Sequence, residues 1–175
     1  MIFSKTKIDG VAIVEIEPRK DERGYFQRIY DALKFKKKGI NFKFVQINQS
    51  MSQHKGTIRG IHMQKFPKSE DKLIQCIKGS IFDVVIDLRP DSKTYGKWIG
   101  VVLEANQKMI FVPKGCAHGF QALENDTIIQ YPASEYYSPR HEIGIRWNDP
   151  YFKIKWPLKK IQVSKKDASW PNFVI

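Results

Sequence analysis

The sequence has few cysteines and no long apolar segment. Only 2 of its 175 residues are cysteine, too few for a disulfide framework, so we expect a protein of a reducing compartment. No apolar run approaches the roughly 20 residues that cross a bilayer, and residues 1–7 lack the apolar core of a secretion signal. These absences predict a cytoplasmic protein with no membrane partner.

Acidic residues are also scarce. The chain has 18 Asp+Glu against 30 Lys+Arg, a formal net charge of +12, which favours anionic ligands. No helix-turn-helix, zinc-finger or RNP-type motif accompanies this charge, so we expect no nucleic-acid partner. A non-catalytic protein that binds an anionic sugar or a polynucleotide is kept as the alternative to an enzyme.

Neither an internal repeat nor a Pro/Gly/Ser-rich linker interrupts the chain, which predicts one domain over residues 1–175. Hydrophobic residues make up 42% and aromatic residues 13%, enough for a real core with a preference for β-structure. A helix is expected over 31–38, ended by Gly39. Strands are expected over 11–16, 42–50, 58–64, 73–78, 80–88, 98–103, 108–112, 118–123, 127–134 and 142–147.

The spacing of these short strands favours an all-β sandwich or barrel, followed by an irregular C-terminal tail. The tail carries tryptophans that pack in a core or plug one end of a barrel. In the strand over 80–88, Phe82, Val84 and Ile86 share an apolar face, and Asp83 lies on the other face. Asp83 therefore faces solvent or an enclosed polar pocket.

Two runs of residues combine histidines with turn and strand patterns. In Arg59-Gly60-Ile61-His62-Met63-Gln64, His62 and Gln64 share one strand face, whereas Arg59 needs Gly60 or a bulge to reach the same space. In residues 112–120, Pro-x-Gly-x-x-His forms a turn that delivers His118 onto the next strand, as in the second half of the cupin signature. Each histidine by itself is more often a structural residue than a catalytic one.

Metal-binding cupins place His-x-His and then a glutamate in the first half of their signature. This chain has His62-x-Gln64 followed by Lys72, and a lysine ammonium repels a divalent cation. We therefore expect no metal and no cofactor. The remaining His, Lys and Arg residues suggest acid–base chemistry on an anionic substrate.

Nine motifs in register resemble the dTDP-4-dehydrorhamnose 3,5-epimerase family over nearly the whole chain. The resemblance implies a metal-free, cupin-like double-stranded β-helix (jelly roll) with short helices, active as a homodimer that exchanges strands. The motifs are Asp21–Gly24, Gln46-x-Asn48-x-Ser50, Arg59–Gln64, Lys72–Ile74, Phe82–Arg89, Thr94–Trp98, the Pro-x-Gly-x-x-His turn, Tyr136–Pro139 with Trp147–Pro150, and Ser164–Asp167.

The resemblance also implies roles in an epimerisation next to a ketone. His62 would be the base, with Asp167 as the carboxylate that orients its imidazole. Lys72 would face the enolate oxygen, and Tyr131 would donate a proton from the opposite side.

Substrate-binding roles are implied in the same way. Arg23, Arg59 and His118 would hold the diphosphate or nucleotide, and Tyr137 would stack on the base. Asp83 would line the cavity near His62. The remaining polar contacts would come from Gln46, Asn48, Glu142 and Lys166.

The implied substrate is a nucleotide-diphosphate sugar, and the implied reaction is epimerisation at C3 and C5 of dTDP-4-dehydro-6-deoxy-D-glucose. Arg28 departs from the family pattern, which usually has glutamate at this position in the nucleotide region. An epimerase of C3 or C5 alone, or one acting on a CDP- or GDP-linked sugar, is therefore an alternative.

Overall fold

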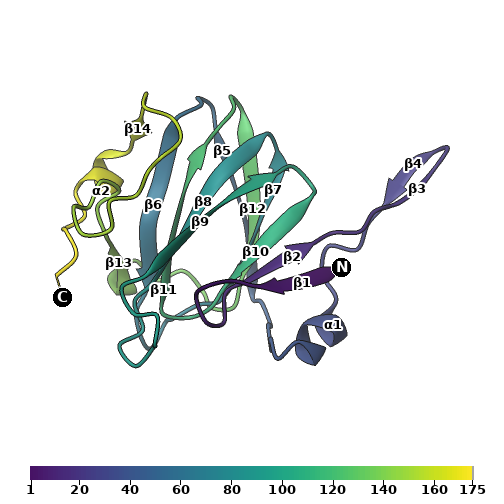
Figure 1. Cartoon of the computed structure of the whole chain (residues 1–175), viewed down its shortest axis with the longest axis horizontal. Helices are drawn as coiled ribbons and strands as arrows, with labels where there is room; N and C mark the ends of the chain where they lie inside the picture. The colour runs from purple at the N-terminus through teal and green to yellow at the C-terminus, as the bar shows by residue number, and fades with distance from the viewer. Residues whose placement is uncertain (175) are drawn as a thin grey trace.

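Two facing β-sheets form most of the molecule in the computed structural model shown in Figure 1, which describes residues 1–174. The first sheet has the strand order β1-β2-β10-β7-β12-β5. The second has the order β13-β6-β11-β8-β9, with β14 parallel to β6. The strands are β1 (Ile2–Lys5), β2 (Ala12–Glu15), β3 (Arg19–Asp21), β4 (Gly24–Phe26), β5 (Gln46–Ser52), β6 (Thr57–Gln64), β7 (Lys72–Lys78), β8 (Ser80–Asp87), β9 (Trp98–Glu104), β10 (Lys108–Val112), β11 (Cys116–Ala122), β12 (Thr127–Ala133), β13 (Glu142–Gly144) and β14 (Gln162–Val163).

Strands β5 to β8 alternate between the two sheets, and so do β9 to β13. This winding is the double-stranded β-helix, and it confirms the predicted all-β jelly roll. The helical segments are short: α1 (Ala32–Lys37), the 3₁₀ turn η1 (Pro139–His141) and α2 (Lys165–Ala168). Among residues 1–174, no helix has both the length and the apolar character to cross a membrane.

The interior between the sheets is built from the inward faces of their central strands. Ile74 and Ile110 of the first sheet pack with Val85, Leu103 and Phe120 of the second in one buried cluster. Because side chains alternate along a strand, the neighbours of these residues point outward. Each sheet therefore has a second apolar face that needs its own cover.

Helix α1 covers the outer face of the first sheet. Asp31 caps its N-terminus by accepting hydrogen bonds from two backbone amides, and Phe35 is fully buried against Leu73 and Met109. Phe42 joins this cluster through ring contacts rather than through a strand ladder. The strand expected over 42–50 therefore begins only at Gln46.

The C-terminal segment covers the outer face of the second sheet. Val84 and Ile86 of β8 pack there against Phe152, with Trp98 and Trp156 beside them. The tryptophans therefore pack on a sheet face and do not plug a barrel end. The strand expected over 142–147 ends at Gly144, where the chain leaves β6 for this covering segment.

Three short strands complete the fold: β1, β3 and β14. The pattern of apolar residues in the sequence does not indicate them. Strands β3 and β4 form a hairpin that projects away from the two sheets (Figure 1). All six strand residues of the hairpin are exposed, so no core within residues 1–174 holds the hairpin.

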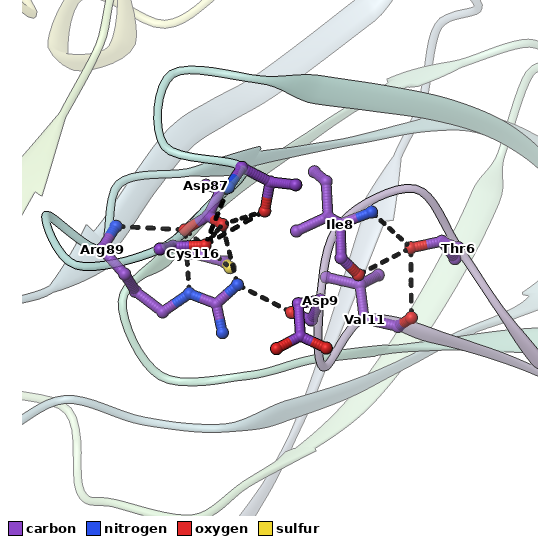
Figure 2. A network of polar contacts seen from close by, with 9 residues as sticks. Thr6, Ile8, Asp9, Val11, Asp87, Arg89 and Cys116 are labelled. Carbon is purple, nitrogen blue, oxygen red and sulfur yellow. Dashed lines mark hydrogen bonds and ion pairs between the residues drawn. The ribbon is translucent and has the colours of Figure 1, made fainter.

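A polar network ties the end of β8 to the N-terminal segment (Figure 2). Asp87 is fully buried, and its carboxylate accepts two hydrogen bonds of 2.8 Å from Arg89 and two of 2.6 Å from the hydroxyls of Ser92 and Thr94. Arg89 also donates to the carbonyl oxygen of Asp9 at 2.7 Å. Burial alone would raise the pKa of Asp87, but these hydrogen bonds lower it well below its usual range.

Candidate active site

A polar cavity lies between the two sheets and has two lobes of about 290 and 270 Å³. His62, Lys72 and Tyr131 line both lobes and so form the boundary between them. The sequence patterns around these three residues are separate along the chain, and the jelly-roll winding brings them together.

The imidazole and the phenol come from facing sheets. His62 lies on β6 of the second sheet, and Tyr131 lies on β12 of the first. Lys72 begins β7, the strand beside β12, where it pairs with Ala133. A ligand between the sheets would therefore meet His62 on one side and Tyr131 with Lys72 on the other.

His62 is held in its basic form. Burial, and after it the nearby Lys72 ammonium, lower the pKa of His62 to about 3, although the carboxylate of Glu142 opposes the shift. The imidazole is therefore neutral at neutral pH and has a free nitrogen to accept a proton.

Tyr131 is held in its acidic form. Burial raises the pKa of the Tyr131 phenol, and the carboxylate of Glu70 adds to this effect. The phenol stays protonated at neutral pH. One wall of the cavity thus presents a proton acceptor and the facing wall presents a proton donor.

The carboxylate beside His62 differs from the expected one. Glu142 Oε1 lies 3.7 Å from His62 Nδ1, because β13 pairs with β6 and places Gly144 opposite His62. Across residues 1–174, Asp167 makes no hydrogen bond to His62. Asp167 instead lies on the one-turn helix α2 of the C-terminal segment and lines the smaller lobe beside Ser164.

Glu142 also contacts Tyr137 and Lys166 at the edge of the larger lobe. Its Oε2 accepts a hydrogen bond of 2.7 Å from the hydroxyl of Tyr137 and lies 2.5 Å from Lys166 Nζ. On the same lobe, Gln46 donates to Asn48 and accepts from the backbone amide of Tyr137. The predicted ligand contacts Gln46, Asn48, Tyr137 and Glu142 therefore lie together.

Asp83 occupies a different place from the predicted one. It is fully buried, and its Oδ2 lies 2.6 Å from Nε2 of His118. His118 lines the smaller lobe, so Asp83 lies behind His118 and orients it rather than lining the cavity near His62. Of the two positions left open for Asp83, solvent and an enclosed polar site, the enclosed site is correct.

A bulge in β6 brings Arg59 into the smaller lobe. The pairing of β11 with β6 shifts between His118 and Phe120, and Gly60 has a φ of +97° with no room for a Cβ, which would lie 2.6 Å from the carbonyl oxygen of His118. Arg59 is then fixed by hydrogen bonds to Ser52 and to the backbone of Met51. The predicted need for Gly60 or a bulge is confirmed.

Arg23 is a predicted site residue that lies far outside this cavity. It sits on the projecting β3–β4 hairpin, is 82% exposed and pairs with Asp21 at 2.7 Å. Arg28 follows the hairpin and lies 3.8 Å from Asp31. Within this chain, neither residue reaches the two lobes.

Other cavity residues carry weaker sequence signals. Gln64, which shares the strand face of His62, lines the larger lobe, and Ser50 and Ile129 line the smaller one. Glu70 is a cavity residue that the sequence patterns do not indicate, because it precedes β7 and has no strand periodicity. Residues 1–174 contain no group of three or more His, Cys, Asp or Glu side chains placed to hold a metal ion.

The class of protein follows from the fold and the site together. The fold is a jelly roll, and its cavity holds a neutral base, a protonated phenol and a lysine, which define a cupin-like isomerase that moves protons next to a carbonyl. Comparison with known proteins gives the family. The family model described as dTDP-4-dehydrorhamnose 3,5-epimerase matches residues 5–174. The chain belongs to the dTDP-4-dehydrorhamnose 3,5-epimerase family.

Individual relatives agree with this assignment. The chain is 44% identical over 172 residues to the dTDP-4-dehydrorhamnose 3,5-epimerase of Methanothermobacter thermautotrophicus, covering 96% of this chain and 92% of the relative. A crystal structure of the Bacillus anthracis enzyme with TDP and PPi bound superposes with a TM-score of 0.95 at 41% identity, covering 98% and 99% of the two chains. The Legionella pneumophila enzyme in complex with dTDP-4-keto-L-rhamnose gives 0.92 at 38% identity, covering 98% and 92%.

Proposed function

We propose that the chain epimerises C3 and C5 of dTDP-4-dehydro-6-deoxy-D-glucose to give dTDP-4-dehydro-L-rhamnose. The observation that carries this proposal is the placement of a neutral imidazole and a protonated phenol on facing walls of one cavity, with Lys72 beside the phenol. The bound ligands of the Bacillus anthracis and Legionella pneumophila structures support a dTDP-linked substrate.

The proposed chemistry uses each of these groups once per inverted carbon. His62 removes the proton from a carbon next to the 4-keto group, and the electron pair delocalises onto the keto oxygen as an enolate. Lys72 stabilises the negative oxygen, because a fixed charge in an enclosed site acts most strongly where charge develops. Tyr131 returns a proton from the opposite face, which inverts the carbon. His62 then releases its proton to solvent and Tyr131 takes one up from solvent, after which the two steps are repeated at the second carbon.

Substrate binding follows from the two lobes. Arg59 presents a planar guanidinium that suits a diphosphate, and His118, held by Asp83, lies in the same lobe. Tyr137, 53% exposed at the mouth of the larger lobe, offers a ring for the base. Gln46, Asn48, Glu142 and Lys166 supply polar contacts, and Asp167, which lines the smaller lobe together with His62, is retained as its carboxylate partner.

Exchange of solvent deuterium tests the proposed reaction directly. With dTDP-4-dehydro-6-deoxy-D-glucose in D₂O, we expect NMR of the sugar to show one deuteron at C3 and one at C5. A single deuteron would restrict the enzyme to one carbon, and no deuteron would refute the function. The same assay with CDP- and GDP-linked sugars tests the nucleotide, for which Arg28 is the residue in question.

Two variants distinguish the role of the base from the role of the acid. His62→Asn is expected to abolish exchange at both carbons because no proton is removed. Tyr131→Phe is expected to reduce inversion more than exchange, since the enolate still forms but takes its proton back from the original side. An equal loss of inversion and exchange in Tyr131→Phe would contradict the donor role.

We further propose that the functional unit is a homodimer with exchanged hairpins. The β3–β4 hairpin projects from the body (Figure 1) with Tyr25 58% and Phe26 61% exposed. The edge strand β5 also exposes Ile47 and Met51. Such apolar surface is typical of an interface, and a partner that received the hairpin would gain Arg23 at its own site.

A further inference from the structure

Lys72 has a carboxylate partner that the chemistry above does not use. Lys72 Nζ lies 2.9 Å from Glu70 Oε1, and the two side chains are only 8% and 9% exposed. Glu70 lines the larger lobe together with His62 and Tyr131. The ion pair is therefore part of the cavity wall and not a surface contact.

Several charged groups surround Lys72, but only Glu70 among the described residues pairs with it. The charged and titratable groups that line the cavity with it come from β6, β11, β12, the 137–142 segment and α2: Arg59, His62, His118, Tyr131, Tyr137, Glu142, Lys166 and Asp167. Glu142 is already engaged by Lys166 and Tyr137. Within residues 1–174, Glu70 is the one carboxylate that forms an ion pair with Lys72.

The position of Glu70 in the chain suits a holding role. It lies two residues before Lys72, in the segment that leads into β7, and both side chains line the larger lobe. Glu70 also lies close enough to Tyr131 to help raise the pKa of the phenol, after the larger effect of burial. One carboxylate thus contacts the cation and influences the acid on the same wall.

We propose that Glu70 is a positioning residue that holds the Lys72 ammonium on the wall beside Tyr131, aimed at the oxygen on which the enolate charge develops. This inference rests on the proposed function. Without the carboxylate, repulsion from Arg59 and Lys166 is free to turn the ammonium away from that oxygen. The charge would remain in the cavity but would act from the wrong place.

Glu70→Gln tests the proposal because it keeps the side-chain shape and removes the charge. We expect kcat for deuterium exchange to fall about tenfold with KM changed less than about threefold, a smaller loss than the roughly hundredfold cost of removing an oxyanion donor itself. Glu70→Asp, which keeps the charge, should recover part of this loss. Glu135→Gln is the matched control, since Glu135 forms an ion pair with Lys68 outside the two lobes and should leave both constants unchanged.

A double-mutant cycle with Lys72→Gln shows whether Glu70 acts through Lys72. If it does, Glu70→Gln has no further effect on kcat in the Lys72→Gln background. In urea unfolding of the same four proteins, Lys72→Gln should lower the midpoint and the added Glu70→Gln should restore part of it, because an unpaired carboxylate is removed.

The outcomes separate this inference from the function on which it rests. Additive losses of kcat, or a Glu70→Gln enzyme with wild-type kcat, would overturn the role of Glu70 while the wild-type exchange still supports an epimerase. Absence of coupling in the unfolding cycle would also overturn it. A wild-type protein without exchange would instead refute the proposed function.

Discussion

At the scale of single residues, burial in one cavity shifts the pKa of the base and the pKa of the acid in opposite directions, and both shifts are useful. Burial disfavours the charged form of any group, so it removes the proton from the His62 imidazolium and retains the proton of the Tyr131 phenol. Epimerisation needs these two states at the same pH. Enclosure between the sheets therefore contributes to the chemistry directly, besides excluding water.

The lowered pKa of His62 predicts an unusual pH profile. The base form of a histidine is lost as pH falls through its pKa, and for His62 that value lies below the ordinary 6.5. We therefore expect kcat/KM, which reports the free enzyme, to stay constant as the pH is lowered through 6.5. Circular dichroism at each pH serves as the control for unfolding. An acidic limb centred at or above 6.5 would contradict the role of His62 or its environment.

At the scale of elements, strand alternation explains which parts of the site were predictable from the sequence. It placed His62 with Gln64 and turned Asp83 away from the apolar face of its strand, because side-chain direction on a strand is a local property. It did not reveal that the apolar face of β8 packs against residues 145–156, since that contact depends on where the C-terminal segment crosses the sheet.

Contacts between segments that are distant in the sequence were harder to predict. Asp167 was assigned to His62 through resemblance, whereas in the structure β13 brings Glu142 to His62. Asp83 was expected in the cavity, but its contact with His118 depends on the register between β8 and β11, which places Val85 opposite His118. No periodicity within one segment encodes such a register. Glu70 precedes β7 and has no strand periodicity, so only the folded chain shows its contact with Lys72.

At the same scale, the hydrogen bonds of Asp87 with Arg89, Ser92 and Thr94 hold the loop between β8 and β9 in place. Asp87→Asn is expected to reduce the free energy of unfolding by about 2 kcal/mol at pH 7, because Arg89 and two hydroxyls lose a charged acceptor. Since the pKa of Asp87 is lowered in the folded state, its contribution to stability is present above the ordinary aspartate pKa of 3.8 and is lost as pH falls below it. Urea unfolding at pH 7 and at low pH measures both effects.

The matched control for this prediction is Asp91→Asn, an exposed carboxylate on the same loop, which should leave the unfolding midpoint unchanged. A wild-type midpoint for Asp87→Asn at pH 7 would show that the network contributes no stability. A difference that persists at low pH would show that the carboxylate charge is not its source.

At the scale of the whole molecule, the distribution of exposed residues separates two interpretations of the +12 charge. A polynucleotide-binding protein needs a continuous basic surface, and its affinity falls steeply with salt. Arg59 and Lys72 line a cavity together with the neutral His62 and the phenol of Tyr131, and the exposed aromatic hairpin projects away from the two sheets (Figure 1). The cavity favours a small anionic substrate, and the hairpin favours a second copy of the chain.

Mixing a weakened variant with an inactive variant tests the exchanged hairpin. Arg23→Ala should weaken the site that receives the hairpin, and His62→Asn should inactivate the site on its own chain. When the two variants are unfolded together and refolded at equal amounts, about half of the dimers are mixed and each of these holds one intact site, so about a quarter of the wild-type activity should return. Mixing without refolding is the control. If activity does not return although light scattering shows a dimer, Arg23 acts on its own subunit and the hairpin is not exchanged.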